Sequence, residues 1–178
     1  ILDVKRVDRF IDWLDALSSR GINFNAAWLG DGPLRVTMQE RAKKSSVCID
    51  WRGQVDAEDV QRELARTDIM LLTSEYEVLP LAALEALGNA VPIISVDFFG
   101  VEEFVSDFYT GLIFPRNIEP ADAGEKIASF LRDSELKKRA SSNAKKVFLR
   151  SFLGVHFMAS EYRVFYQDIN RSIAGGEK

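Results

Sequence analysis

Residues 73–86 have the sequence Thr-Ser-Glu-Tyr-Glu-Val-Leu-Pro-Leu-Ala-Ala-Leu-Glu-Ala and directly follow the apolar run Ile-Met-Leu-Leu at 69–72. The run is too short for a helix and ends at a break, so it predicts a buried strand. Pro80 fits the first turn of a helix, where a missing N–H costs nothing. The stretch therefore predicts a strand, a loop that contains Glu77, and a helix with Glu85 in its second turn.

The predicted helix 80–88 has an apolar stripe formed by Leu81, Leu84 and Leu87. Glu85 lies four residues after Leu81 and borders this stripe, where a carboxylate needs a partner or access to water. Because helical side chains lean toward the N-terminus of their helix, Glu85 is expected to point toward the carboxyl end of the strand. Two carboxylates thus converge near a helix N-terminus, a position that favours anionic ligands.

Predicted strands and helices alternate along the rest of the chain. The pattern predicts strands at 23–29, 47–51, 69–72, 92–96 and 111–114, and helices at 7–17, 33–44, 57–66, 80–88, 119–131, 135–149 and 155–169. Such alternation indicates an α/β protein with a Rossmann-like, doubly wound parallel sheet and helices on both faces. Ligands of such sheets bind beyond the carboxyl ends of the strands.

Composition excludes several functional classes. The chain has 178 residues, the size of one domain, and its net charge of −4 argues against a nucleic-acid-binding module. The single cysteine, Cys48, excludes an intrachain disulfide and a cysteine zinc cluster. No apolar run approaches the roughly 20 residues of a membrane span. We expect a cytoplasmic protein that binds no nucleic acid.

Glu77 and Glu85 are separated by seven residues and are followed by Ala-Val-Pro-Ile-Ile-Ser-Val-Asp at 90–97 and Thr-Gly-Leu-Ile-Phe-Pro at 110–115. This arrangement resembles the Glu-x7-Glu motif and following segments of retaining glycosyltransferases of the GT-B architecture, family 4. The resemblance implies the donor-binding, C-terminal half of a GT-B fold. Residues 1–150 are then the nucleotide-sugar-binding domain, and 151–174 a helix that reaches toward an N-terminal domain.

The resemblance implies roles for particular residues. Glu77 is expected to face the hydroxyls of the donor sugar and Glu85 to accept hydrogen bonds from the ribose of the nucleotide. Both roles suit an ionised carboxylate, which can only accept. The backbone N–H groups of Val78, Leu79 and Leu81 are expected near oxygens of the sugar and the diphosphate. The family usually has glycine in place of Val78, and a β-branched residue is costly if that position requires a positive φ.

Three further segments match the family. Lys5-Arg6-Val7-Asp8 resembles a helix start whose lysine binds the diphosphate, so Lys5 joins Glu77 as a candidate catalytic residue. A cation there stabilises charge that develops on the departing nucleotide. The turn that contains Gly30 and Gly32, and the loop that contains Gly100, are the other candidate donor-binding segments.

The family resemblance also bears on ligands and partners. The donor is expected to be a nucleotide diphosphate sugar, with no cofactor and no metal, since the family is generally metal-independent and we see no Asp-x-Asp triplet beside a diphosphate site. Six basic residues mark helix 135–149 and its end, for which a solvated face is favoured over contact with an acidic membrane surface. A non-catalytic α/β regulatory or protein-binding module and a sugar-nucleotide epimerase-like domain remain as alternatives, because a fold does not fix function.

In the resembling family a buried strand precedes the loop that carries the lysine matched by Lys5, and residues 1–4 are too few for strand and loop together. In the strand order 3-2-1-4-5-6 that strand is central, and without it backbone donors and acceptors on two neighbouring strands lack partners. We expect these residues to belong to a longer chain with an N-terminal domain. Either the central strand comes from outside residues 1–178, or its two neighbours close on each other.

Overall fold

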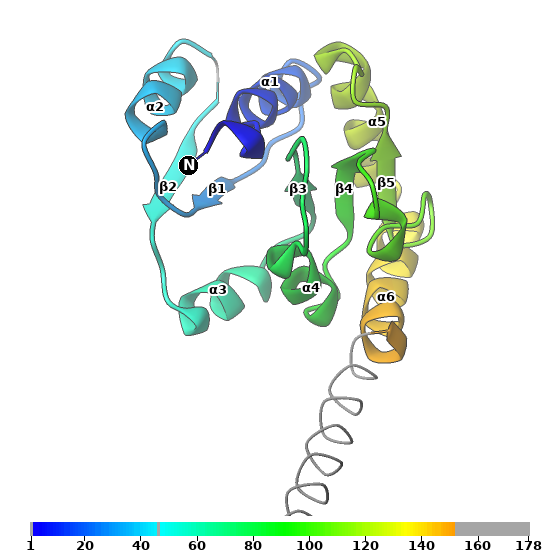
Figure 1. The fold of residues 1–178 in the computed structure, drawn as a ribbon. Coiled ribbons are helices and arrows are strands. Elements are labelled where there is room, and N and C mark those ends of the chain that lie inside the picture. The colour runs from blue at the N-terminus through cyan, green and yellow to red at the C-terminus, as the bar shows by residue number, and fades with distance from the viewer. Residues whose placement is uncertain (1, 46, 152–178) are drawn as a thin grey trace, which may run out of the picture.

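The computed structural model describes residues 2–45 and 47–151. Parallel strands and helices alternate along this part of the chain (Figure 1). The strands are β1 Ala26–Leu29, β2 Ile49–Gly53, β3 Met70–Leu72, β4 Ile93–Val96 and β5 Gly111–Phe114. The helices are α1 Val7–Ser18, α2 Arg35–Lys43, α3 Ala57–Leu64, α4 Leu81–Gly88, α5 Pro120–Arg132 and α6 Ser134–Ser151, with short 3-10 helices η1 Asp3–Lys5 and η2 Val101–Glu103. The predicted helix 155–169 and the predicted C-terminal segment 151–174 lie outside the described residues, apart from the end of α6.

The strands form two parallel sheets, β1-β2 and β3-β4-β5. Figure 1 shows them across the molecule in the order β2, β1, β3, β4, β5, with α1, α2 and α5 above and α3, α4 and α6 below. In the described chain no hydrogen-bonded ladder joins β1 to β3. β1 and β3 therefore do not pair with each other. Direct pairing of these two strands is one of the two arrangements expected from the sequence, and the structure does not have it. Residues Asp3–Lys5 form a 3-10 helix instead of a strand.

The burial of β4 on both faces of the sheet explains why its residues are all apolar or small. All four residues of β4 are buried, and neighbouring side chains serve opposite faces of the sheet. Ile94 packs in a cluster with Trp13 of α1 and Ile127 of α5, whereas Ile93 packs in a cluster with Leu87 of α4. Both faces of the three-stranded sheet are thus covered by helices, as the alternating pattern predicts.

Two glycines permit close backbone approaches that fix this packing. A Cβ at Gly111, the first residue of β5, would lie 1.7 Å from the carbonyl oxygen of Ile93, so no other residue fits there. A Cβ at Gly124 of α5 would lie 2.7 Å from the Cβ of Ala16 at the facing surface of α1. These contacts explain the glycine in the 110–115 segment and the tight packing of α1 against α5.

The predicted apolar stripe of α4 is partly wrong. Leu81 is 63% exposed, and the fully buried residues of the helix are Ala83, Ala86 and Leu87. The small alanines let α4 lie close to the sheet, whereas Leu81 belongs to a first turn that projects into solvent. Pro80 is the N-cap of α4 and not a residue of its first turn.

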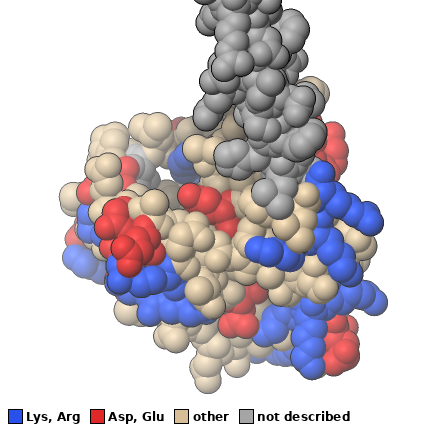
Figure 2. Space-filling view, turned by 90° about the horizontal axis from the view of Figure 1, so that it is seen from below, with Lys and Arg blue, Asp and Glu red and all other residues tan. Residues whose placement is uncertain are grey.

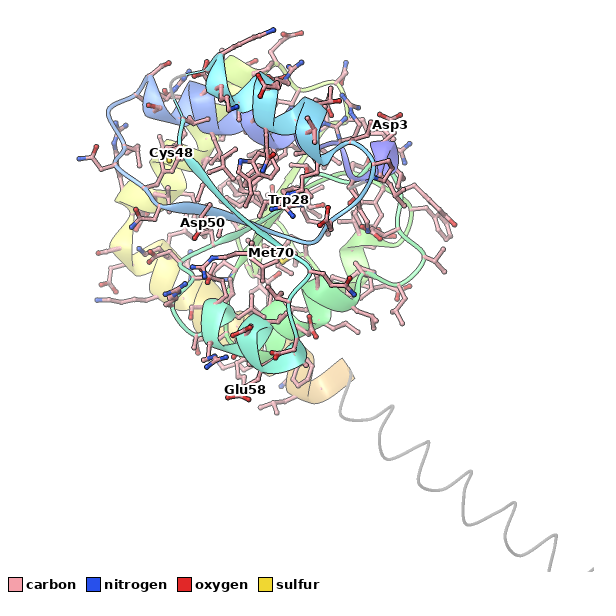
Figure 3. The ribbon with its side chains drawn as sticks, turned by 90° about the vertical axis from the view of Figure 1, so that its left-hand side faces the viewer. Asp3, Trp28, Cys48, Asp50, Glu58 and Met70 are labelled. Carbon is pink, nitrogen blue, oxygen red and sulfur yellow. The ribbon has the colours of Figure 1, made fainter. Side chains whose placement is uncertain are left out.

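Trp28 of β1 and Met70 of β3 lie near the middle of the molecule, while Glu58 lies on the outer side of α3 (Figure 3). The ring of Trp28 meets Phe10 of α1 edge to face at 5.2 Å between centroids. This contact anchors α1 over the β1 side of the fold. It helps to place the N-terminus of α1, which carries the candidate site.

Figure 2 shows Lys and Arg side chains gathered at the right of this face, which is the side where Figure 1 places α6, a helix with several basic residues. Several of them are engaged within the domain. Lys137 pairs with Asp68 at 2.9 Å, Lys138 pairs with Glu135 at 3.2 Å, and Lys145 donates to the carbonyl of Gly88. These bonds agree with a solvated face. Within the described residues no helix is long and apolar enough to cross a membrane.

Candidate functional site

Lys5 and Glu77, the two candidate catalytic residues, meet in the structure. The ammonium of Lys5 donates to Glu77 Oε1 at 2.7 Å. The Glu77 side chain is 10% exposed, whereas that of Lys5 is 43% exposed. The pair lies where the start of α1 meets the loop after β3, at the carboxyl edge of the sheet. The family resemblance implied that both residues belong to one donor site, and the structure brings them into contact.

An unusual backbone places Lys5. Lys5 ends η1, and the next residue, Arg6, is the N-cap of α1 with φ 48° and ψ 53°, which is the left-handed region. The Arg6 N–H donates to the carbonyl of Asp3 at 2.9 Å. A left-handed conformation is uncommon for a residue with a Cβ, so surrounding contacts must hold it. The sharp turn aims Lys5 at the β3 loop while Val7 begins the helix.

The backbone of this turn is bonded directly to the β3 loop. The Thr73 hydroxyl donates to the carbonyl of Lys5 at 3.0 Å, and the Glu75 N–H donates to the carbonyl of Val4 at 2.8 Å. Thr73 and Ser74 are buried. The segment that leads to Glu77 is therefore held against the segment that carries Lys5.

Arg6 and Arg9 surround the carboxylate of Glu75. Arg6 donates to Glu75 Oε2 at 2.8 Å and Arg9 donates to the same oxygen at 3.0 Å. Burial acts to raise the pKa of Glu75, but hydrogen bonds and charge from the two arginines outweigh it and lower the pKa. Asp8, paired with Arg6 at 2.9 Å, likewise has a lowered pKa because the Arg6 bonds outweigh burial. The hydrogen bond with Asp8 is also the main cause of the raised pKa of Arg6.

Glu85 is partly buried in α4. No described residue forms a hydrogen bond or an ion pair with its carboxylate, although its backbone carbonyl accepts from the Asn89 side chain at 2.9 Å. A partly buried carboxylate without a partner among the described residues has acceptor capacity available for a ligand. The predicted ribose contact of Glu85 stays a prediction.

The loop between the two glutamates has an ordinary backbone at Val78. Among the described residues that are not glycine, positive φ occurs at Arg6, Ala90 and Phe108, so valine in place of the family's usual glycine carries no strain of that kind. Val78 is 82% exposed. The N–H of Leu81 donates to the carbonyl of Leu79 at 2.9 Å, so that predicted donor is already engaged. The N–H groups of Val78 and Leu79 have no acceptor among residues 2–45 and 47–151.

The two glycine loops lie at the same edge of the sheets but do not bond to the Lys5–Glu77 pair in the described structure. Gly30 and Gly32 follow β1, where Asp31 accepts from the Gly32 N–H at 2.7 Å and the Gly30 N–H donates to the carbonyl of Gly53 at 2.7 Å. Gly100 follows β4 with φ 85° and caps η2. Both loops stay candidate donor-binding segments.

Sequence reasoning missed Arg9. As a charged residue of the predicted helix 7–17 it is expected to face solvent, yet it is 8% exposed. Its partners lie 64 to 107 positions away, so helical spacing alone could not reveal them. Trp13, four residues later on the same side of α1, is also buried, so Arg9 lies on the packed face of the helix.

Lys5 can bind an anionic group, and Glu77 beside it can accept a hydrogen bond from a hydroxyl group. Lys5 uses one of its three donors on Glu77, and Glu77 keeps a second oxygen. The described residues contain no group of three or more His, Cys, Asp or Glu side chains placed to hold a metal ion, and metal independence stays a prediction.

Comparison with known proteins identifies the family. The sequence pattern of the family described as Glycosyl transferases group 1 matches residues 1–147. The chain belongs to this family. This group 1 chain is 30% identical over 146 residues to the alpha-D-kanosaminyltransferase of Streptomyces kanamyceticus, a match that covers 79% of the chain and 36% of the relative. The chain thus spans about a third of the length of that relative.

Solved structures agree on the fold. The C-terminal domain of a glycosyl transferase group 1 family protein, LpcC from Francisella tularensis, matches with a TM-score of 0.75 and 18% identity over 85% of this chain and 82% of that one. A mutant of S. aureus TarM, solved with fondaparinux, alpha-GlcNAc-glycerol and UDP, matches with a TM-score of 0.80 and 18% identity over 93% of this chain and 34% of that one. The predicted fold, the C-terminal domain of a GT-B glycosyltransferase, is confirmed.

Proposed function

We propose that this group 1 domain binds the nucleotide diphosphate sugar that a longer glycosyltransferase uses as its donor. The observation that carries the proposal is the Lys5–Glu77 pair, 2.7 Å apart at the carboxyl edge of a parallel sheet. Ligands of doubly wound sheets bind at that edge. The solved TarM mutant, a structural neighbour of this domain, was crystallised with UDP, which supports a donor that contains a nucleoside diphosphate.

In this proposal Lys5 faces the diphosphate and Glu77 faces the hydroxyls of the sugar. A lysine fixed near the diphosphate stabilises the charge that develops as the nucleotide leaves. Glu77 can accept sugar hydroxyls with its second oxygen while its first oxygen keeps Lys5 in place. Glu85 accepts ribose hydroxyls, and the N–H groups of Val78 and Leu79 donate to oxygens between the two ends of the donor. Transfer with retention of configuration is part of the same proposal.

The acceptor site and the remainder of the catalytic site lie, in this proposal, on an N-terminal domain of the same longer chain. The facing edges of the two sheets indicate that a further strand lies between them in the longer chain. Within the described residues β1 and β3 are neighbours in the order that Figure 1 shows, but no ladder joins them, and backbone groups left unpaired inside a fold are costly. A strand from residues outside 1–178 pairs with both edges and joins the two sheets.

A ligand scan tests the donor proposal. We expect one nucleoside diphosphate among UDP, GDP, ADP and dTDP, together with its glucose conjugate, to raise the thermal stability of the full-length protein. A ligand at 100 times its Kd stabilises a protein by about 2.7 kcal/mol. Lys5→Met should abolish most of the shift, and Lys138→Met, which removes a lysine paired on α6, should retain it. Equal shifts in both variants would remove Lys5 from the site.

A further inference from the structure

Arg9 links three parts of the domain. From α1 its guanidinium donates to the carbonyl of Thr73 at 2.9 Å, to Glu75 Oε2 at 3.0 Å and to the carbonyl of Arg116 at 3.3 Å. The residue is 8% exposed. A buried guanidinium is stable only when it is paired and hydrogen-bonded, so these bonds fix the segments that accept them.

The segment 73–75 is held from two sides. On one side Arg6 and Arg9 share the Glu75 carboxylate. On the other side the Thr73 hydroxyl and the Glu75 N–H bond to the carbonyls of Lys5 and Val4. Glu77 lies two residues after this clamped segment. The clamp therefore sets the separation between the Lys5 ammonium and the Glu77 carboxylate without touching either of those two groups.

We infer that Arg9 and Glu75 are positioning residues of the donor site, which keep Glu77 in register with Lys5 so that one ligand can contact both. This inference rests on the proposed donor-binding function. Arg9 and Glu75 should affect binding of the sugar end of the donor, because they hold the loop that carries Glu77. A merely structural arginine would change stability but would leave the preference for a sugar-bearing nucleotide unchanged.

The test compares two affinities by calorimetric titration of the full-length protein. The probes are UDP, GDP, ADP and dTDP and the glucose conjugate of each, and the readout is the ratio of conjugate affinity to nucleoside diphosphate affinity for the pair that binds. Arg9→Met and Glu75→Gln should each lower this ratio about tenfold, which corresponds to about 1.4 kcal/mol. Arg9→Lys, which retains a cation for Glu75, should recover part of the loss.

Two comparisons separate positioning from general destabilisation. In a Glu77→Gln background Arg9→Met should lower the ratio no further, because the group that it positions is already altered. Arg20→Met is the matched control, since Arg20 also ties α1 to neighbouring segments through the carbonyls of Ala16 and Ala121 and through Glu125. It should lower thermal stability and leave the ratio unchanged. If Arg9→Met fails to fold, Glu75→Gln provides the test. The Glu75 side chain is 41% exposed, so its substitution should disturb folding less.

The outcomes distinguish the two levels of the argument. If the unsubstituted protein binds none of the eight probes, the proposed function fails and the inference fails with it. If it binds and Glu77→Gln lowers the ratio, but Arg9→Met, Arg9→Lys and Glu75→Gln leave the ratio unchanged, the inference alone is overturned. A ratio that Glu77→Gln does not change also overturns the inference, because the clamped loop then does not meet the sugar.

Discussion

Lys5 Nζ and Glu77 Oε1 are 2.7 Å apart although the two residues are 72 positions apart in the chain. The contact joins the start of α1 to the loop after β3, and the bonds from the Thr73 hydroxyl and the Glu75 N–H to the carbonyls of Lys5 and Val4 hold these two segments together. Its worth for stability is small, since exposed ion pairs contribute at most about 1 kcal/mol and Lys5 is 43% exposed. In the proposed function the pair has a different purpose, which is to contact the two parts of one donor molecule.

Glu77→Ala should separate the two ends of the donor. Because Glu77 faces the sugar in the proposed function, the substitution should leave affinity for the free nucleoside diphosphate nearly unchanged and should lower turnover in the full-length enzyme. Removing a charged hydrogen-bond acceptor costs about 1.5–3 kcal/mol at the sugar end. Calorimetry with the nucleoside diphosphate and a steady-state transfer assay check the two halves of the prediction. Unchanged turnover would exclude Glu77 from the site.

Glu85→Ala should weaken binding of the nucleotide itself. Its carboxylate has no partner among the described residues, so its removal should hardly affect folding while costing about 1.5–3 kcal/mol of nucleoside diphosphate affinity. The matched control is Glu125→Ala on α5, where the carboxylate pairs with Arg20 far from the site. If both variants bind the nucleotide as the unsubstituted protein does, the ribose role of Glu85 is wrong.

Local patterns predicted the helices and strands well, because apolar residues recur at helical spacing in the helices and form short apolar runs in the strands. The strand 111–114 has the bounds predicted from the sequence, and the other elements in the described part of the chain differ by a few residues at their ends. Gly111 explains the accuracy at β5, since a residue with no Cβ is required at the first position of that strand. The placement of Glu77 in the loop after β3 followed from the predicted strand and helix, whereas the resemblance to the family was the source of Lys5 as a site residue.

Features that depend on distant contacts were not predictable in the same way. The burial of Arg9 depends on carbonyls of Thr73 and Arg116, which no local spacing specifies. The exposure of Leu81 depends on how far α4 extends past the sheet. The left-handed turn at Arg6 is flanked by bonds from Thr73 and Glu75 to the carbonyls of Lys5 and Val4, which are distant in sequence, so the local sequence suggested only a helix start.

Glu75 should make stability depend on pH in the acid range. Its pKa is lowered from the ordinary value of 4.5, so its stabilising contribution is fully present above that value and is lost as pH falls through the folded-state pKa. Glu75→Gln should therefore destabilise the protein by up to about 1 kcal/mol at neutral pH, a small effect because the side chain is 41% exposed. The difference from the unsubstituted protein should shrink toward zero well below pH 4.5. Urea unfolding at a series of pH values measures it, and a difference that does not vary with pH would contradict the assignment.

Arg6 provides a test of backbone strain that does not depend on any ligand. Arg6→Gly and Arg6→Ala remove the same bonds to Asp8 and Glu75, but alanine keeps a Cβ at φ 48° whereas glycine adopts that conformation freely. Arg6→Gly should therefore be more stable than Arg6→Ala by about 1 kcal/mol in urea unfolding.

The control for this comparison is Arg62, which has helical backbone in the last turn of α3 and is largely exposed. There the order should reverse, with Arg62→Ala more stable than Arg62→Gly by about 1 kcal/mol, because alanine is the better helix former. Opposite signs at the two positions would show that the turn between η1 and α1 is left-handed in solution. The same sign at both would mean that Arg6 has ordinary helical backbone, and the geometry that directs Lys5 toward Glu77 would then be wrong.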